Sequence, residues 1–146
     1  CVLFSKQSYL TSGPITKRML MKQLLFVLMF LPMMAFAQTG MTQITAALNS
    51  GNAETLGGYF DEAMELSILE EEGIYNKSQA LQKVKRFLSS NKVSSFTEVH
   101  QGASRSSDSQ YVIGDLKTSG GTYRVYLFLT NSNGKMIIQE LRFDRE

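Results

Sequence analysis

Three apolar-rich runs near the end of the chain constrain its fold more than any other feature. The runs span residues 111–118, 122–130 and 135–143. Apolar and polar side chains largely alternate within them, as in strands whose successive side chains point to opposite faces of a sheet. Gly120 and Gly121 separate the first two runs, and residues 132–134 separate the last two. Glycine adopts the positive φ of tight hairpin turns, so the sequence predicts three antiparallel strands.

The lengths of the two turns predict which residues lie opposite each other. A two-residue turn at Gly120 and Gly121 places Leu116 opposite Val125. A three-residue loop that ends at Gly134 places Val125 opposite Leu141. One face is then almost wholly apolar across all three strands. A two-residue turn at Asn133 and Gly134 would bring Glu140 and Arg142 onto this face, and we therefore reject that turn.

The opposite face of the predicted sheet is more apolar than a solvated surface requires. Its apolar members are Tyr111, Ile113, Tyr126, Phe128 and Ile138. Charged residues such as Asp115 and Arg124 lie among them. Because an apolar patch of this kind is typical of an interface, we expect a partner to cover it. Two-fold homodimers are the commonest oligomers, and we expect this partner to be a second copy of the chain.

A hydrophobic segment near the N-terminus is typical of a secretory signal peptide. Met21 and Lys22 precede an apolar core at residues 24–31, and Ala35 and Ala37 form an A-x-A cleavage motif. We expect cleavage after Ala37. Residues 1–20 are then an upstream or misannotated segment, residues 21–37 the signal, and residues 38–146 a single domain. No integral membrane segment is expected after cleavage.

Charge and cysteine content exclude several classes of function. Residues 1–37 hold four basic residues and no acidic one, so the remainder has 15 − 4 = 11 basic and 13 acidic residues and a net charge of −2. This balance does not favour nucleic-acid binding. The single cysteine, Cys1, precedes the signal, which excludes a lipoprotein, thiol catalysis and cysteine-based metal sites in the mature chain. We expect a soluble periplasmic or extracellular protein with no cofactor and no metal.

The residues between the signal and the strands predict helices and a short hairpin. Thr42 caps a first helix that ends at Gly51, and Asn52 caps a second that carries Leu56, Tyr59 and Phe60. Residues 63–69 alternate as a strand, residues 70–73 turn, and residues 74–75 return. Asn76 and Gln79 form a capping box for a helix that ends near Ser89, and a further strand covers residues 96–104. The predicted order is α-α-β-β-α-β-β-β-β.

This order of elements, together with the signal, resembles a secreted Bacteroidetes-type family of domains of unknown function. The resembling stretches are residues 44–48, 51–53, 59–61, 72–75, 100–102, 123–126 and 138–143. The resemblance covers essentially the whole mature chain. It implies an α+β fold of the nuclear-transport-factor-2-like or cystatin-like type, in which helices pack on a strongly curved antiparallel sheet. The family carries no established activity, so the resemblance implies no catalytic residues.

The single histidine, His100, is the main candidate for acid–base chemistry, with Glu98 beside it on the same strand. A three-residue loop at residues 106–108 turns both His100 and Glu98 toward the interior of the cone, whereas a two-residue turn at residues 106–107 turns Val99 and Gln101 inward. The sequence leaves both turns open. An inward His100 with room over Gly114 could transfer protons at neutral pH.

We favour an exported, non-enzymatic binding or assembly module, with room for a small apolar ligand between helices and sheet. The positions expected to line such a pocket are Tyr59, Tyr75, Gly114 and Leu127. The competing hypothesis is a small isomerase- or dehydratase-like enzyme. It would use His100 and Glu98, with the hydroxyl of Tyr59 or Tyr75 nearby. The two hypotheses differ in whether these groups converge in an open pocket.

Overall fold

The structure, a computed structural model, describes residues 36–104 and 108–146. Almost all of the predicted signal peptide and most of the loop at residues 106–108 therefore lie outside the described residues. The described helices are α2 (Phe36–Ser50), α3 (Ala53–Gly57) and α4 (Lys77–Ser90). The described strands are β1 (Phe60–Ile68), β2 (Glu71–Asn76), β3 (Val93–Ala103), β4 (Ser109–Thr118), β5 (Gly121–Ser132) and β6 (Lys135–Arg145). Their order confirms the predicted sequence of helices and strands.

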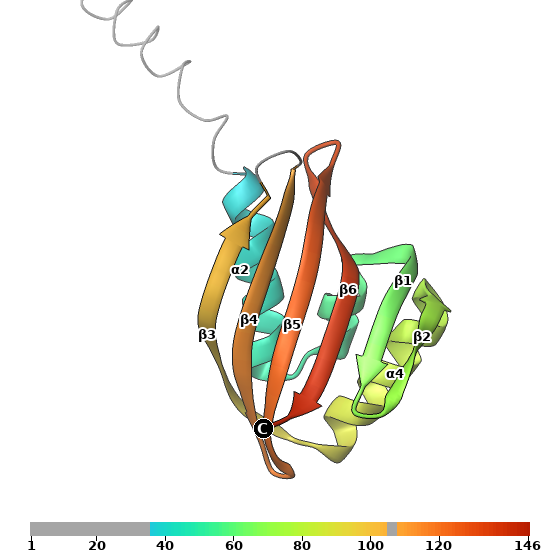
Figure 1. Cartoon of the computed structure of the whole chain (residues 1–146), viewed down its shortest axis with the longest axis vertical. Coiled ribbons are helices and arrows are strands. Elements are labelled where there is room, and N and C mark those ends of the chain that lie inside the picture. The colour runs from blue at the N-terminus through green and yellow to red at the C-terminus, as the bar shows by residue number, and fades with distance from the viewer. Residues whose placement is uncertain (1–35, 105–107) are drawn as a thin grey trace, which may run out of the picture. The chain divides into compact units, whose positions relative to one another are not determined.

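The strands form one curved sheet that does not close. Its order is β2-β1-β6-β5-β4-β3, with β1 parallel to β6 and the other neighbours antiparallel. The helices lie together on one face of this sheet, which we call the inner face (Figure 1). None of the described helices covers the opposite face, which we call the outer face.

Local signals explain where two of the helices begin. The Asn76 side chain accepts a hydrogen bond from the Gln79 N–H at 2.9 Å, and the Gln79 side chain accepts one from the Asn76 N–H at 3.4 Å. This capping box confirms the predicted start of α4. Asn52 likewise accepts a hydrogen bond from the Thr55 N–H at 3.1 Å at the start of α3. Both caps satisfy N–H groups that have no partner within the helix.

Two predicted boundaries of the first two helices are wrong. Helix α2 begins at Phe36 rather than after Thr42, and α3 ends at Gly57, so that Phe60 opens strand β1. Packing against β6 overrides the poor helix propensity of Gly40, because a Cβ there would lie 2.9 Å from Cγ of Met136. Phe60 pairs with Ile138 on β6 and is buried, so sheet pairing decides its conformation.

The predicted register of β4 and β5 is wrong by two residues. Thr118 lies opposite Gly121, so the turn residues are Ser119 and Gly120, and Leu116 faces Tyr123 rather than Val125. A shift of two keeps every side chain on its predicted face. Tyr123 lies in the core, where its hydroxyl donates to Asn91 Oδ1 at 3.1 Å. This contact ties the hairpin to the end of α4.

The turn between β5 and β6 is the one that the sequence argument rejected. Asn133 and Gly134 form a two-residue turn with φ values of 53° and 79°, the signature of a primed hairpin turn. A β-bulge on β6 adds one residue, Gln139, between the pairs Phe128–Glu140 and Leu129–Ile138. The bulge keeps Glu140 on the outer face although the turn is short. Rejecting the two-residue turn was wrong, because the prediction assumed that β5 and β6 pair without a bulge.

The bulge also changes the face of one predicted interface residue. Ile138 is fully buried on the inner face, and Ile137 takes a half-buried place outside. Ile138 therefore belongs to the core and not to the outer face. The core lies between the helices and the inner face, where Phe87 of α4 contacts Tyr123 and Phe143 at ring-centroid distances of 5.1 and 4.8 Å.

Strand β3 forms one edge of the sheet, and helix α2 covers part of that edge. The Asn49 side chain on α2 accepts a hydrogen bond from the Phe96 N–H at 2.9 Å. This N–H does not take part in the ladder with β4. A β-bulge interrupts β3 between Glu98 and His100.

Candidate functional site

The space expected beside Gly114 is filled. A Cβ at this position would lie 2.4 Å from Cζ of Phe96 and 2.7 Å from the carbonyl oxygen of Thr97. The ring of Phe96 thus occupies the volume that a small ligand would need. Leu127, another predicted pocket residue, is fully buried in the core. These two positions pack the interior instead of lining a pocket.

The two tyrosines predicted for the pocket have other partners. The hydroxyl of Tyr59 donates to Gln43 Oε1 on α2. The ring of Tyr75 on β2 lies under the ammonium group of Lys83, 4.8 Å from its nitrogen, and Lys83 also pairs with Glu71 at 3.3 Å. The predicted pocket residues therefore do not come together at one cavity.

His100 and Glu98 lie on opposite faces of the sheet. The bulge adds Val99 between them, so that Glu98 lies opposite Gly114 on the inner face and His100 lies opposite Ile113 on the outer face. Each of the two turns that the sequence left open therefore predicts the faces on one side of the bulge. The three-residue loop is right for Glu98, and the two-residue turn is right for Gln101, which pairs with the buried Val112. The convergence that the enzyme hypothesis requires is absent, and the hypothesis is wrong in this respect.

The outer face carries the other predicted site. Tyr111, Ile113, Tyr126 and Phe128, which we call the apolar patch, are all half-buried on β4 and β5. The rings of Tyr111 and Tyr126 lie 6.4 Å apart at 20°. The ring of Tyr111 also lies over Gly102, where a Cβ would be 2.5 Å from Cε1, and its hydroxyl lies 2.9 Å from Nε2 of His100. These contacts hold the Tyr111 ring flat against the sheet.

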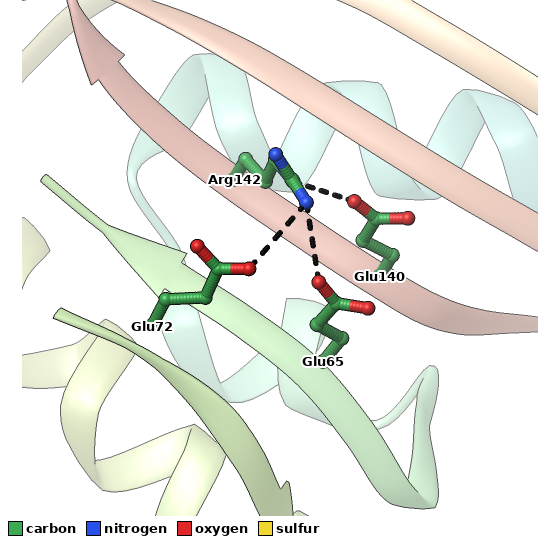
Figure 2. A network of polar contacts seen from close by, with 4 residues as sticks. All are labelled: Glu65, Glu72, Glu140 and Arg142. Carbon is green, nitrogen blue, oxygen red and sulfur yellow. Dashed lines mark hydrogen bonds and ion pairs between the residues drawn. The ribbon is translucent and has the colours of Figure 1, made fainter. Parts of the chain in front are cut away.

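A network of charged groups lies beside the apolar patch. Arg142 on β6 contacts Glu140 at 2.5 Å, Glu65 on β1 at 3.1 Å and Glu72 on β2 at 3.7 Å (Figure 2). The hydrogen bond from Arg142 to Glu140 is the main cause that raises the pKa of the guanidinium above its ordinary value. Three carboxylates around one guanidinium leave an excess of negative charge. The network also joins three neighbouring strands.

This network could not be predicted from the sequence. Glu72 was expected in the turn at residues 70–73, and no pairing of β1 with β6 was expected. Charged residues alternate with apolar ones on these strands, which indicates a polar face. Only the parallel pairing of β1 and β6 brings the charged groups into contact. That pairing joins segments that are far apart in the chain.

A second ion-pair group lies below the patch on β4 and β5. Nε of Arg124 is 2.7 Å from Oδ1 of Asp115, and its Nη2 contacts Glu146. The hydrogen bond with Glu146 is the largest cause that raises the pKa of Arg124. Partial burial, and then the negative charge of Glu140, raise the pKa of the Tyr126 hydroxyl.

Two openings among the described residues are lined by other residues than the four predicted for the pocket. One of about 780 Å³ lies at the turn between β1 and β2 and is wide open to solvent. Another of about 360 Å³ lies between α2 and the edge of β3, with Asn49, Phe96 and Glu98 among its lining residues. Residues 36–104 and 108–146 contain no cluster of side chains suited to a metal ion. In the same residues no helix is long and apolar enough to cross a membrane.

Comparisons with known proteins agree with the fold and extend over most of the chain. Residues 41–144 match the model of the family described as "Domain of unknown function (DUF4783)". A crystal structure of a DUF4783 family protein from Bacteroides fragilis is similar, with 31% identity, a TM-score of 0.67, and coverage of 71% of this chain and 96% of that chain. No curated protein matches this chain.

More distant structures share the fold alone. An NTF2-like protein of unknown function from Cytophaga hutchinsonii has 14% identity and a TM-score of 0.53, and the match covers 74% of this chain and 89% of that one. A domain with a cystatin-like fold from Nostoc punctiforme has 12% identity and a TM-score of 0.57, with 74% of each chain covered. The chain therefore belongs to the DUF4783 family, with an α+β fold of the nuclear-transport-factor-2-like type.

Proposed function

We propose that this protein is an exported, non-enzymatic binding or assembly module that acts through the outer face of its sheet. The observation that carries the proposal is the half-buried apolar patch on a face that no described helix covers. Contiguous apolar surface on a folded domain is costly in water, and a partner that covers it removes this cost. We propose a second copy of the chain as that partner.

The arrangement of side chains inside the cone favours the hypothesis of a binding module over that of an enzyme. Phe96 fills the space over Gly114, and the sheet separates His100 from Glu98. An acid–base pair must reach the same substrate atoms, and these two side chains point to opposite faces. The ring of Phe96 also takes the space over Gly114 that an apolar ligand at this position would need. The outer face is the remaining predicted site.

The size of the particle in solution tests this proposal. We expect sedimentation of the purified protein to give the mass of a dimer at micromolar concentration. Phe128→Lys places a charge in the apolar patch and should give a monomer, because an unpaired buried charge is expensive at an interface. Ile74→Lys is the matched control. Ile74 is 80% exposed on edge strand β2 and lies outside the patch, so this variant should remain dimeric.

Two results would contradict the proposal. The first is a wild-type protein that remains monomeric across the concentration range. The second is a Phe128→Lys variant that is folded by circular dichroism and still dimerises as strongly as the wild type.

The export part of the proposal has its own test. We expect the full chain, expressed in a Gram-negative host, to appear in the periplasmic fraction with Gln38 as its first residue by mass spectrometry. Ala37→Arg should block this cleavage, because signal cleavage requires a small residue there. Recovery of the wild type from the cytoplasm with residues 21–37 still attached would contradict export.

A further inference from the structure

Three rows of side chains cross the outer face over four neighbouring strands, in the order β3, β4, β5, β6. The rows, taken from the pairing of residues across the sheet, are Gly102–Tyr111–Phe128–Glu140, His100–Ile113–Tyr126–Arg142 and Thr97–Asp115–Arg124–Asp144. The members of each row lie at about the same height along the strands. The rows therefore give a map of what any partner would meet.

The two central members of each row have matching chemistry. Tyr111 pairs with Phe128, and Ile113 pairs with Tyr126, so that two rows are apolar at their centre. In the third row Asp115 pairs with Arg124, an acid with a base. The β4 half and the β5 half of the outer face therefore match each other. If a two-fold rotation places the β4 half of one copy on the β5 half of another, the two surfaces are complementary.

From these rows we infer the arrangement of the dimer: its two-fold axis runs along the strands, between β4 and β5. The inference rests on the proposed function, because it requires the outer face to bind a second copy. Rotation about this axis places β5 of one copy against β4 of the other at equal height. Phe128 then meets the partner's Tyr111, and Arg124 meets the partner's Asp115. The strands of the two sheets run nearly in line, as in most packed sheets.

The charged residues on β1, β2 and β6 favour this axis over an axis that runs across the strands. Glu65, Glu72, Glu140 and Asp144 carry four negative charges on β1, β2 and β6, and Arg142 carries one positive charge, so these five residues have a net charge of 1 − 4 = −3. An axis across the strands would place this group against itself. Like charges that face each other at an interface repel and weaken binding.

The axis along the strands removes this repulsion. Strand β6 then faces β3 of the partner, whose row members are Gly102, His100 and Thr97. None of these three is an acidic residue, so the carboxylates of β6 meet no like charge there. Strand β2 projects past the edge of the partner's sheet, so that Ile74 stays in contact with water. Its exposure of 80% in the single chain would change little.

Chemical cross-linking between single-cysteine variants tests the axis. In a Cys1→Ser background, one chain carries Thr97→Cys and a second chain carries Asp144→Cys. Both positions are exposed and lie at opposite ends of the same row. Packed sheets lie about 10 Å apart, which a short bis-maleimide can bridge. We expect mixed samples to give a strong cross-linked dimer and each variant alone to give little.

The alternative axis predicts another cross-link. Rotation about an axis across the strands, through the middle row, would place Asp144 against Glu140 of the partner. Strong linkage of Asp144→Cys with Glu140→Cys, without linkage of Asp144→Cys with Thr97→Cys, would overturn the inference. A dimer by sedimentation that gives neither product would also overturn it and leave the proposed function standing. A monomer would overturn both.

A charge at position 97 gives an independent measurement. Thr97 is exposed and would face Asp144 of the partner, so Thr97→Lys should tighten the dimer roughly fivefold and Thr97→Glu should weaken it by a similar factor. A purely structural role of Thr97 would not produce opposite effects from the two charges. Equal dissociation constants for the two variants would contradict the inferred arrangement.

Discussion

The two faces of the sheet are formed by the same strands, yet their side chains differ in burial and in kind. On β5 the odd-numbered residues from Tyr123 to Leu129 are buried against the helices, and the even-numbered residues between them are half-buried on the outer face. The inner face is filled by apolar groups. The outer face mixes aromatic rings with ion pairs, a composition typical of surfaces that are covered only in an assembly.

The comparison can be tested most strongly with adjacent residues on opposite faces. Leu127→Ala should lower the free energy of unfolding by about 2–5 kcal/mol, because it opens a cavity in a closed core. Phe128→Ala should lower the free energy of unfolding of the isolated chain by about 1 kcal/mol, because this side chain is already partly exposed to water. Urea unfolding at a concentration where the protein is monomeric measures both. Equal losses would show that the outer face is packed as tightly as the inner one.

Two glycines give a second comparison between the faces. Gly114→Ala should cost about 1–3 kcal/mol, because the new methyl group meets the backbone oxygen of Thr97 as well as the ring of Phe96. The three atoms nearest to the new methyl group of Gly102→Ala all belong to the side chain of Tyr111, which can turn away into solvent. We expect a smaller loss for Gly102→Ala, together with loss of the contact between Tyr111 and His100. Thermal unfolding of the two variants side by side decides the order.

The ion pairs of the outer face should contribute little to the stability of a single chain. Arg142→Met removes all three contacts with Glu65, Glu72 and Glu140. The Arg142 side chain is 38% exposed, and pairs of this kind are screened by solvent, so we expect a loss of about 1 kcal/mol or less. Chemical unfolding at low and high salt measures it. A loss of several kcal/mol would show that the network contributes as much to the free energy of unfolding as a core residue does.

The smallest expected effect concerns the hydroxyl of Tyr126. Its pKa is raised above 10.0 by partial burial, so the folded chain keeps this proton at a pH where the unfolded chain releases it. The contribution of Tyr126 to stability is therefore complete below pH 10.0 and falls as pH rises through the raised pKa. Alkaline unfolding of the wild type and of Tyr126→Phe should show less loss with pH in the variant. Identical slopes would argue against burial of this hydroxyl.

The alternation of residues was sufficient to predict the elements and most of the inner face. Val125, Leu127 and Leu141 lie on the inner face as alternation predicts, although Val125 pairs with Phe143 rather than with Leu141. The capping box at Asn76 marks the start of α4 as predicted. Local signals of this kind involve residues that are close in sequence. The error of two residues between β4 and β5 changed partners but no faces, because side-chain direction repeats every two residues.

The bulges at Gln139 and Val99 explain the parts of the site that could not be predicted. A single extra residue at Gln139 exchanges Ile137 and Ile138, and one at Val99 separates His100 from Glu98. A bulge leaves no clear mark in one sequence, since it depends on how a strand must bend to follow the curved sheet. The parallel pairing of β1 with β6 was missed for a related reason, because the two strands are distant in sequence.

The edge of β3 has a consequence for solubility. Asn49 occupies the N–H of Phe96, and the bulge at Val99 bends the strand at its middle. An edge that is partly blocked and bent is a poor template for a strand from another molecule, which is how natural sheets avoid growing into fibres. When copies of this protein meet at high concentration, strand pairing through the β3 edge is therefore disfavoured. Assemblies of finite size are favoured over fibres that grow by adding strands.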